Sequence, residues 1–301
     1  MDNKKNILIV GGTGFIGYHL AKKCLKKGWK VTSISSKKPL TKRYLPKVKY
    51  IICDITKKKF LEKKITKSFK YVVNLGGYVD HSNKKKTFES HYLGCKNLAD
   101  IFLKKKPISF VQMGSSIEYG NARSPHRENI KCKPHSTYGK AKLFSSIYLI
   151  KLFRKKKFPC TILRLYQAYG PGQDLNRIIP IVISSCIKNE KFPCSKGNQL
   201  RDFIHVEDVV EAILKSLTNK DAIGQILNIG SGKPRKIINI IKYINKNLKG
   251  GYPLFGKIKL RKDEILKVYP DTAKAKNIIN WRPKIPFQKG IKKTIDSYKR
   301  L

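Results

Sequence analysis

The stretch Ile7-Leu8-Ile9-Val10-Gly11-Gly12-Thr13-Gly14-Phe15-Ile16-Gly17 decides the fold of this chain. Its four apolar residues predict a buried strand, and its glycines carry the spacing G-x-G-x-x-G. Glycines so spaced allow a tight turn, approach of the backbone to a pyrophosphate, and close helix–strand packing. Because a helical pattern follows, we predict a dinucleotide-binding loop made of Gly11, Gly12, Thr13, Gly14, Phe15, Ile16 and Gly17.

Strand-like apolar runs alternate with helical patterns through the first half of the chain. This alternation predicts a mostly parallel sheet with helices on both faces, a doubly wound α/β fold. The predicted strands are 6–10, 30–35, 48–52, 70–75, 108–113 and 160–165, and the predicted helices are 15–27, 59–68, 86–105 and 136–156.

Beyond about residue 166 the pattern changes, and Pro and Gly punctuate it. We predict a cofactor-binding domain at 1–166, which the chain re-enters near 204–230, and a smaller mixed α/β substrate lobe at 167–301. The expected helices of the second part are 176–188, 206–218, 235–248 and 287–299, and its expected strands are 200–204 and 225–229.

The composition indicates a globular protein of the reducing cytoplasm. The 301 residues are 41% hydrophobic, enough for one large domain or two modest ones. We expect no membrane association, because no apolar run reaches 18 residues and the N-terminal run is too short for a signal peptide. Seven scattered Cys without a Cys-x-x-Cys pair predict neither a disulfide framework nor a metal site.

The net charge of +47 raises the alternative of an RNA-binding protein. Only 11 of the 66 basic residues are Arg, whereas nucleic-acid readers favour Arg forks and stacked aromatics. We therefore favour a solvated Lys surface, whose field would still attract anionic small ligands such as nucleotide diphosphates.

The second predicted strand ends in Ser35-Ser36-Lys37, where an acid commonly binds the ribose 2′-hydroxyl of NAD. Hydroxyls followed by Lys would instead suit a 2′-phosphate, so we expect a preference for NADP over NAD; the alternative is one more Lys-rich loop end. Further cofactor contacts are expected from Asp54, Ile55, Leu75, Gly76 and Gly77, although Asp54 could equally cap a turn.

Tyr138 stands four residues before Lys142, so the two side chains share one face of a helix. The ammonium would favour the phenolate and make Tyr138 a candidate proton donor and acceptor. The fifth strand ends at Gly114-Ser115-Ser116, and a hydroxyl there could hydrogen-bond a reacting carbonyl. On their own, the helical pair reads as helix surface and the serine as a turn residue.

Together these motifs resemble the extended short-chain dehydrogenase/reductases, the NAD(P)-dependent sugar-nucleotide epimerases, dehydratases and 4-keto reductases with a Rossmann domain. The resemblance covers nearly the whole chain. The motifs that carry it are Gly11 to Gly17, Asp54, Gly114-Ser115-Ser116, Tyr138-x-x-x-Lys142, Arg164-x-x-x-x-Tyr169-Gly170-Pro171-Gly172, Arg201-Asp202-Phe203-Ile204-His205-Val206-x-Asp208, Asp271-x-x-x-Ala275 and Asn280-Trp281-Arg282-Pro283.

The resemblance implies roles for the site residues. Tyr138 would be the general acid/base, Lys142 would also hold the nicotinamide ribose, and Ser115 would be the catalytic hydroxyl. The substrate would be a nucleotide-diphosphate sugar, and relatives commonly form homodimers through the helix of Tyr138 and its neighbour. The residues expected to touch the substrate are Ser116, Gln167, Arg201 and Arg261.

Three departures from the family pattern limit the reaction. Dehydratases place Asp-Glu directly after the catalytic hydroxyl, where this chain has Ser116 and Ile117; we therefore expect an epimerase or a 4-keto-6-deoxysugar reductase. Glu118 is one position off and would point to the opposite face if the strand continued. Gln167 and His91 replace family Asn residues, and we expect His91 to be a core histidine. His81 could act as a second acid/base, but a surface loop is the more ordinary interpretation.

Overall fold

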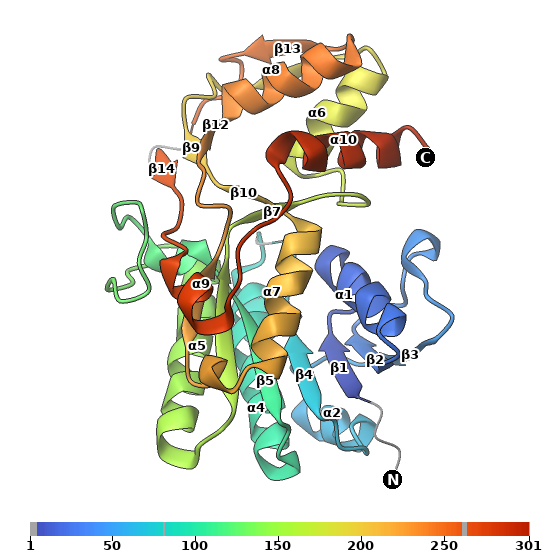
Figure 1. The fold of residues 1–301 in the computed structure, drawn as a ribbon, viewed down its shortest axis with the longest axis vertical. Coiled ribbons are helices and arrows are strands. Elements are labelled where there is room, and N and C mark those ends of the chain that lie inside the picture. The colour runs from blue at the N-terminus through green and yellow to red at the C-terminus, as the bar shows by residue number, and fades with distance from the viewer. Residues whose placement is uncertain (1–4, 81, 261–263, 301) are drawn as a thin grey trace.

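The computed structural model describes residues 5–80, 82–260 and 264–300, and a seven-stranded parallel sheet forms its centre (Figure 1). The strand order is β11-β6-β5-β4-β1-β2-β3, with every neighbouring pair parallel. The predicted doubly wound α/β fold is confirmed. The strands are β1 (Asn6–Val10), β2 (Lys30–Ser35), β3 (Val48–Ile52), β4 (Tyr71–Asn74), β5 (Ser109–Ser115), β6 (Cys160–Leu165) and β11 (Ile226–Ile229).

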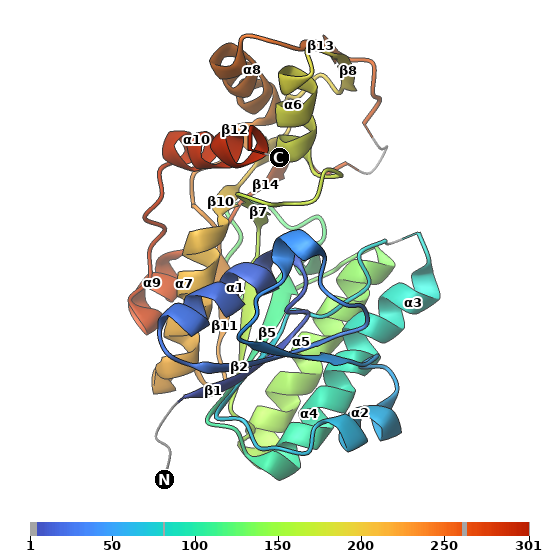
Figure 2. The ribbon, with the colours of Figure 1, turned by 90° about the vertical axis from the view of Figure 1, so that its right-hand side faces the viewer.

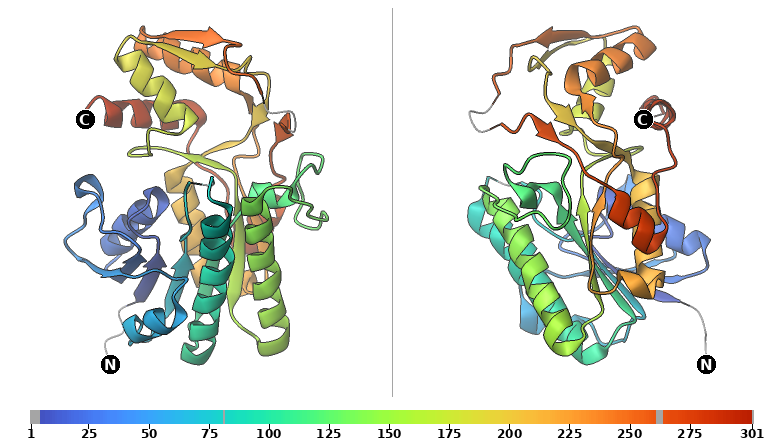
Figure 3. Two further views of the ribbon diagram at one scale, coloured as in Figure 1. Left: turned by 180° about the vertical axis from the view of Figure 1, so that it is seen from behind. Right: turned by 60° about the vertical axis from the view of Figure 1, so that its left-hand side comes forward.

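Helices cover both faces of this sheet (Figures 2 and 3). One apolar core joins the sheet to α1, α7 and α9, and a second joins it to α2, α4 and α5. The central strands β1, β4, β5 and β6 are buried on both faces and therefore read as largely apolar runs rather than alternating ones. The covering helices are α1 (Phe15–Lys26), α7 (Val206–Thr218), α9 (Ala273–Ile279), α2 (Lys58–Lys64), α4 (Gly94–Lys105) and α5 (Thr137–Lys156).

The strand order reverses next to β1. From β1 the chain builds outward through β2 and β3 on one side, then returns to build β4, β5 and β6 on the other. In open α/β sheets the crevice at such a switch point, beyond the carboxyl ends of the strands, is where ligands bind. The glycine loop after β1 opens onto this crevice.

The remaining elements lie beyond the carboxyl edge of the sheet, at the top of Figure 1. Their own apolar core packs α6, α8 and α10 around Tyr169 and Phe203. The chain returns from here to the large sheet as β11; the boundary at 166/167 stays a prediction. The elements are β7 (Gln167–Tyr169), α6 (Ile178–Ile187), β8 (Lys191–Cys194), β9 (Leu200–Arg201), β10 (Phe203–His205), β12 (Arg235–Lys236), α8 (Ile237–Leu248), β13 (Tyr252–Phe255), β14 (Lys267–Val268) and α10 (Phe287–Tyr298).

The predicted single helix at 86–105 is wrong. The chain forms α3 (Lys84–Phe88), a π-helical segment η2 (Glu89–Leu93) and then α4. The Asn83 side chain caps α3 by accepting from the Lys86 amide, which starts the helix two residues earlier than expected. The π-helical segment contains His91. Such segments often occur at functional sites. The predicted helix at 59–68 is also too long, since α2 ends at Lys64.

The predicted strand at 200–204 is broken at Asp202. The Asp202 carboxylate accepts hydrogen bonds from the backbone and the hydroxyl of Ser231, at 2.6 and 2.9 Å. The chain changes sheets at this point, because β9 pairs with β12 and β14 whereas β10 pairs with β7. The short strands β7, β8, β12, β13 and β14 and the helix α9 were not predicted, because two to seven residues carry too little periodicity.

No helix in the described ranges has the length and apolar character to cross a bilayer.

His205 joins the upper elements to the sheet by capping α7. Its Nδ1 accepts from the Glu207 amide at 3.3 Å, and the ring is only 1% exposed. Burial lowers the pKa of His205 to about 4. The unfolded chain, with an ordinary His pKa near 6.5, therefore binds more protons than the folded chain between those two values.

We predict that His205 destabilises the fold as the pH falls from about 6.5 to about 4, by up to about 3 kcal/mol. The variant His205→Asn keeps an N-cap oxygen but does not titrate. It should lose stability at pH 7 yet show a flatter decline towards pH 4 in urea unfolding. The exposed His135→Asn is the control and should retain the wild-type decline. An unchanged pH profile in His205→Asn would contradict the assignment.

Candidate active site at the carboxyl edge of the sheet

The glycine loop has the tight geometry that its spacing predicts. Gly11 has a φ of +78°, which favours glycine. A Cβ on Gly17 would lie 2.2 Å from the Gly11 carbonyl oxygen, and one on Gly12 would lie 2.4 Å from the Ser33 hydroxyl. Both glycines are therefore required for α1 to pack against β1 and β2.

Gly14 has a different role. A Cβ there would meet only the Gly11 oxygen, at 3.3 Å, so the space beside it is open. Gly14 is the N-cap of α1, and no side chain of the described residues caps this helix end. Free amides at a helix N-terminus bind anions, and bulk at Gly14 would stand in their way. The loop therefore fits the pyrophosphate of a dinucleotide.

At the end of β2, one serine is buried and supports the fold, and the next two residues are exposed to solvent. Ser35 is buried, and its Oγ accepts from the Thr13 amide at 3.4 Å, so it holds the glycine loop. Ser36 and Lys37 are exposed beside it. The residues able to meet a ligand here are thus a hydroxyl and an ammonium, with no carboxylate among 33–38.

The ends of β3 and β4 lie against the same loop. The Asp54 carboxylate accepts from the amide and hydroxyl of Thr56, both at 2.9 Å, so it caps a turn as the alternative interpretation holds. Ile55 packs beneath Gly76, where a Cβ would meet its Cδ1 at 3.2 Å. The Leu75 carbonyl lies close above Gly11.

Tyr138 and Lys142 lie on the first turns of α5, which Ser136 caps. Lys142 is 4% exposed, and its Nζ donates to the Met113 carbonyl at 2.7 Å. The same Nζ stands 5.8 Å from the centre of the Tyr138 ring. The helix thus presents the phenol and a fixed ammonium on one face at the end of β5.

His91 packs against the ring of Tyr138. The two rings meet edge-on with centroids 4.8 Å apart. His91 is 7% exposed and its Nε2 lies 3.2 Å from the Tyr78 carbonyl, so it is the buried histidine that the sequence predicts. Ser145 on α5 donates to the His91 carbonyl at 2.9 Å, which ties the π-helical segment to the Tyr138 helix.

A buried polar chain that sequence reasoning missed connects Lys142 to the cofactor side. The Met113 carbonyl also accepts from the Gln112 amide at 3.1 Å, and Gln112 accepts from Asn74 at 2.8 Å. Asn74 in turn accepts from the Gly76 amide at 3.0 Å. Amide side chains within the apolar strands β4 and β5 were the available signal, since buried amides need partners.

Ser115 ends β5, and its hydroxyl accepts from the Ile117 amide at 3.4 Å. The chain then turns into a 3₁₀ helix, η3 (Ser116–Tyr119), instead of continuing as a strand. Glu118 was expected to point to the opposite face only if the strand continued past Ser115, and the strand does not continue. Glu118 is fully buried and reaches back to accept from the Ser115 amide at 2.8 Å, forming a capping box.

The expected substrate residues that the structure describes lie on three different segments: η3, β7 and β9. Ser116 is partly exposed next to Ser115, and Gln167 is exposed on β7. Arg201 lies at the end of β9 and forms an ion pair with Glu264. Arg261 and His81 lie outside the described residues.

A family model describes this combination of motifs and fold. The model of the "NAD dependent epimerase/dehydratase family" matches residues 7–230. The chain belongs to that family. This confirms the resemblance on which the expectations for the site rest.

Relatives of this family member share its full length. A "Putative UDP-glucose 4-epimerase" of Methanocaldococcus jannaschii is 29% identical and aligns over 96% of this chain and 97% of its own. A "CDP-abequose synthase" of Salmonella muenchen is 25% identical over 98% of each chain. The structure of a Thermotoga maritima UDP-glucose 4-epimerase with UDP-glucose superposes with a TM-score of 0.93 at 24% identity, covering 98% of this chain and 99% of that one.

We predict opposite effects of one methyl group at two glycines of the loop. Gly14→Ala should fold with near-wild-type thermal stability yet bind NAD(P) at least about tenfold more weakly, because the methyl occupies the pyrophosphate position. Gly17→Ala should lower the melting temperature instead, because its Cβ meets backbone at 2.2 Å. Melting curves and cofactor-fluorescence titrations measure both effects. Full cofactor affinity in Gly14→Ala would show that the cofactor lies elsewhere.

Proposed function

We propose that this enzyme carries out NAD(P)-dependent oxidoreduction at a sugar carbon of a nucleotide-diphosphate sugar, as an epimerase or a 4-keto-6-deoxysugar reductase. The observation that carries the proposal is the convergence of Tyr138, a buried Lys142 and Ser115 at the strand edge onto which the glycine loop opens. A phenol with a fixed ammonium and a nearby hydroxyl suits proton exchange with a sugar hydroxyl or ketone.

Each side chain has a defined task in this proposal. Tyr138 passes a proton to or from the sugar oxygen, and the Ser115 hydroxyl hydrogen-bonds the same oxygen. Lys142 places its positive charge beside the Tyr138 phenol, because its bond to Met113 holds the ammonium in place. The nicotinamide, when bound, supplies and accepts the hydride.

The positions after Ser115 favour these reactions over dehydration. An elimination needs a second acid and base close to the sugar. Ser116 is a weak acid, Ile117 carries no ionisable group, and Glu118 is buried with its carboxylate hydrogen-bonded inside the protein. The acids that serve a 4,6-dehydratase are therefore missing from this strand end.

We propose that the diphosphate lies under the upper elements, close to Gln167 and Arg201. The guanidinium of Arg201 is partly buried, and a phosphate would compete with Glu264 for it. Arg261 would complete this group. The high positive charge of the chain would draw the anionic substrate towards this site.

We also propose that the enzyme is a homodimer joined through α4 and α5. Exposed apolar side chains on the outer face of α5 support this assembly, since Phe144 and Ile147 are 43% and 55% exposed. Burying them against a second copy would leave the face of the helix that carries Tyr138 free to meet the substrate.

A panel of nucleotide sugars, assayed with both cofactors and by product analysis, tests the function. We expect turnover of at least one member; stoichiometric cofactor consumption identifies a reductase, and none identifies an epimerase. Tyr138→Phe should lower kcat by about 10²- to 10⁴-fold, and Lys142→Ala should lower it comparably. Tyr148→Phe removes a phenol hydroxyl from the same helix and should leave kcat unchanged. Full turnover by Lys142→Ala, or salt-dependent RNA retention without cofactor binding, would refute the proposal.

We predict that the enzyme prefers NADPH to NADH through Ser36 and Lys37. Lys37→Glu should raise the Kd for NADPH by about tenfold or more, because it places a carboxylate beside the 2′-phosphate, and should spare NADH. Lys104→Glu makes the same charge change far away on α4 and is the control. Tighter binding of NADH than of NADPH by the wild type would contradict the preference.

A further inference from the structure

We propose that Glu118 is a positioning residue, whose buried carboxylate fixes Ser115 against the helix that carries Tyr138 and Lys142. The inference rests on the proposed function and adds to it a group that never touches substrate. It concerns how the two halves of the acid/base site, one on β5 and one on α5, are held in register.

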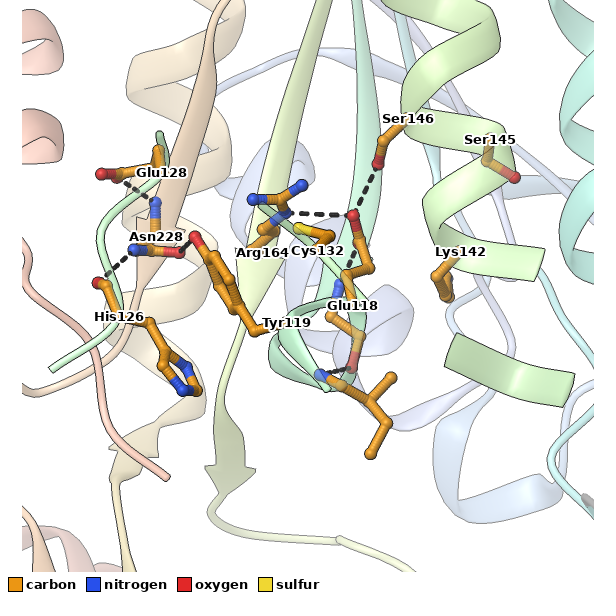
Figure 4. Close-up of polar contacts among 12 residues, drawn as sticks. Glu118, Tyr119, His126, Glu128, Cys132, Lys142, Ser145, Ser146, Arg164 and Asn228 are labelled. Atoms are coloured by element: carbon orange, nitrogen blue, oxygen red, sulfur yellow. Dashed lines mark hydrogen bonds and ion pairs between the residues drawn. The ribbon is translucent and has the colours of Figure 1, made fainter. Parts of the chain in front are cut away.

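The carboxylate of Glu118 makes three hydrogen bonds to three different elements (Figure 4). Its Oε1 accepts from the Ser115 amide at the end of β5, at 2.8 Å. Its Oε2 accepts from the Ser146 hydroxyl on α5 at 2.9 Å and from Nε of Arg164 on β6 at 3.0 Å. One side chain therefore joins the strand that ends in Ser115 to the helix of Tyr138.

The contact on α5 is close to the reacting groups. Ser146 follows Lys142 by four residues, so the two side chains lie on one face of the helix, one turn apart. Lys142 is itself bonded to the Met113 carbonyl on β5. The helix is thus held to β5 by a direct bond from Lys142 and, one turn on, by a bond from Ser146 to the acid that holds Ser115.

Arg164 supplies the counter-charge to this acid inside the protein. Glu118 is fully buried and Arg164 is 3% exposed. Burial lowers the pKa of the Arg164 guanidinium, but Glu118 and Tyr119 reverse this effect and leave the pKa above its usual value. The guanidinium also stacks 4.6 Å from the centre of the Tyr119 ring, and Tyr119 donates to Asn228 on β11 at 2.8 Å. The Tyr119 ring therefore gives the guanidinium a second contact besides Glu118.

The backbone of β5 leaves room for the carboxylate at one position. A Cβ on Gly114 would lie 2.6 Å from Oε1 of Glu118, so only glycine can precede Ser115 while the acid occupies this place. Gly114, Ser115 and Glu118 act as one unit: the glycine admits the carboxylate, and the carboxylate holds the serine.

These contacts exclude Glu118 as an acid/base catalyst and assign it to geometry. Both oxygens are occupied, and the side chain has no exposed surface from which to reach a sugar. Displacing a reacting group by about 1 Å costs about 10²-fold in rate. Loosening Ser115 or the Tyr138 helix should therefore affect turnover much more than substrate binding, because the nucleotide is held elsewhere.

Glu118→Gln tests the clamp in the intact enzyme. The glutamine keeps the shape, but its NH₂ end cannot accept a hydrogen bond. We expect kcat to fall about 10²-fold while KM changes less than about twofold. Asp208→Asn is the control, since Asp208 is also buried and holds the backbone of Lys284 and Ile285. It should lower thermal stability and leave kcat within about twofold.

Ser146→Ala is the second variant, because Glu118→Gln also leaves Arg164 without its counter-charge. Removing one hydroxyl keeps the ion pair and the Ser115 bond, and should lower kcat by about 3- to 10-fold, again without a change in KM. Ser146→Thr restores a donor and should recover part of the loss. Wild-type kcat in Ser146→Ala together with wild-type kcat in Glu118→Gln would overturn the proposal.

Hydrogen exchange separates a failed clamp from a failed function. If the wild type turns over no nucleotide sugar, the proposed function fails, and exchange of residues 113–119 then decides about Glu118. We expect the Ser115 amide to lose protection in Glu118→Gln and to keep it in Asp208→Asn. Unchanged protection in Glu118→Gln would overturn the clamp whatever the enzyme's substrate.

Discussion

The site depends on the burial of one ammonium group. Lys142 lies inside the protein, where a charged group is tolerated only if it is well hydrogen-bonded, and its partner is the Met113 carbonyl at 2.7 Å. This bond fixes α5 against the end of β5 and so determines where the Tyr138 ring stands. Through Gln112 and Asn74 the same carbonyl is linked to Gly76, at the edge of the glycine loop. The residues proposed for proton transfer and those proposed for cofactor binding are thus joined by one chain of hydrogen bonds.

The sheet could be predicted from sequence because its central strands are buried on both faces and read as apolar runs. The glycine loop could be predicted because the spacing G-x-G-x-x-G between a strand and a helix is typical of a dinucleotide-binding turn. The strand 6–10 and the loop to Gly17 were predicted on that basis, and their positions agree with β1 and α1. The elements beyond residue 166 were harder. Strand β9 ends at Asp202 because of a tertiary contact with Ser231, 29 residues further along the chain, and no local pattern encodes such a contact.

At the candidate site, sequence identified which residues gather but not which of them are already occupied. Spacing and order placed Ser115, Tyr138 and Lys142 together. Only the structure shows that Asp54 caps its own turn and that Arg201 pairs with Glu264. Side-chain partners are chosen by three-dimensional proximity, so a long flexible residue such as Arg201 is the least predictable type. The Lys-rich surface gives little information about the fold, because exposed ion pairs contribute little to its stability.

Glu118 shows how backbone geometry decides the role of an acid. If β5 continued past Ser115, alternation would place Glu118 on the opposite face from the residue before it. The chain instead turns into a 3₁₀ helix, and the capping box brings the carboxylate back under Ser115. An acid that enters a buried pair with Arg164 loses access to substrate and gains control over neighbouring groups. In the mechanism proposed for this member of the family, the acidic charge beside Ser115 would therefore hold the site together, and proton exchange would be left to Tyr138.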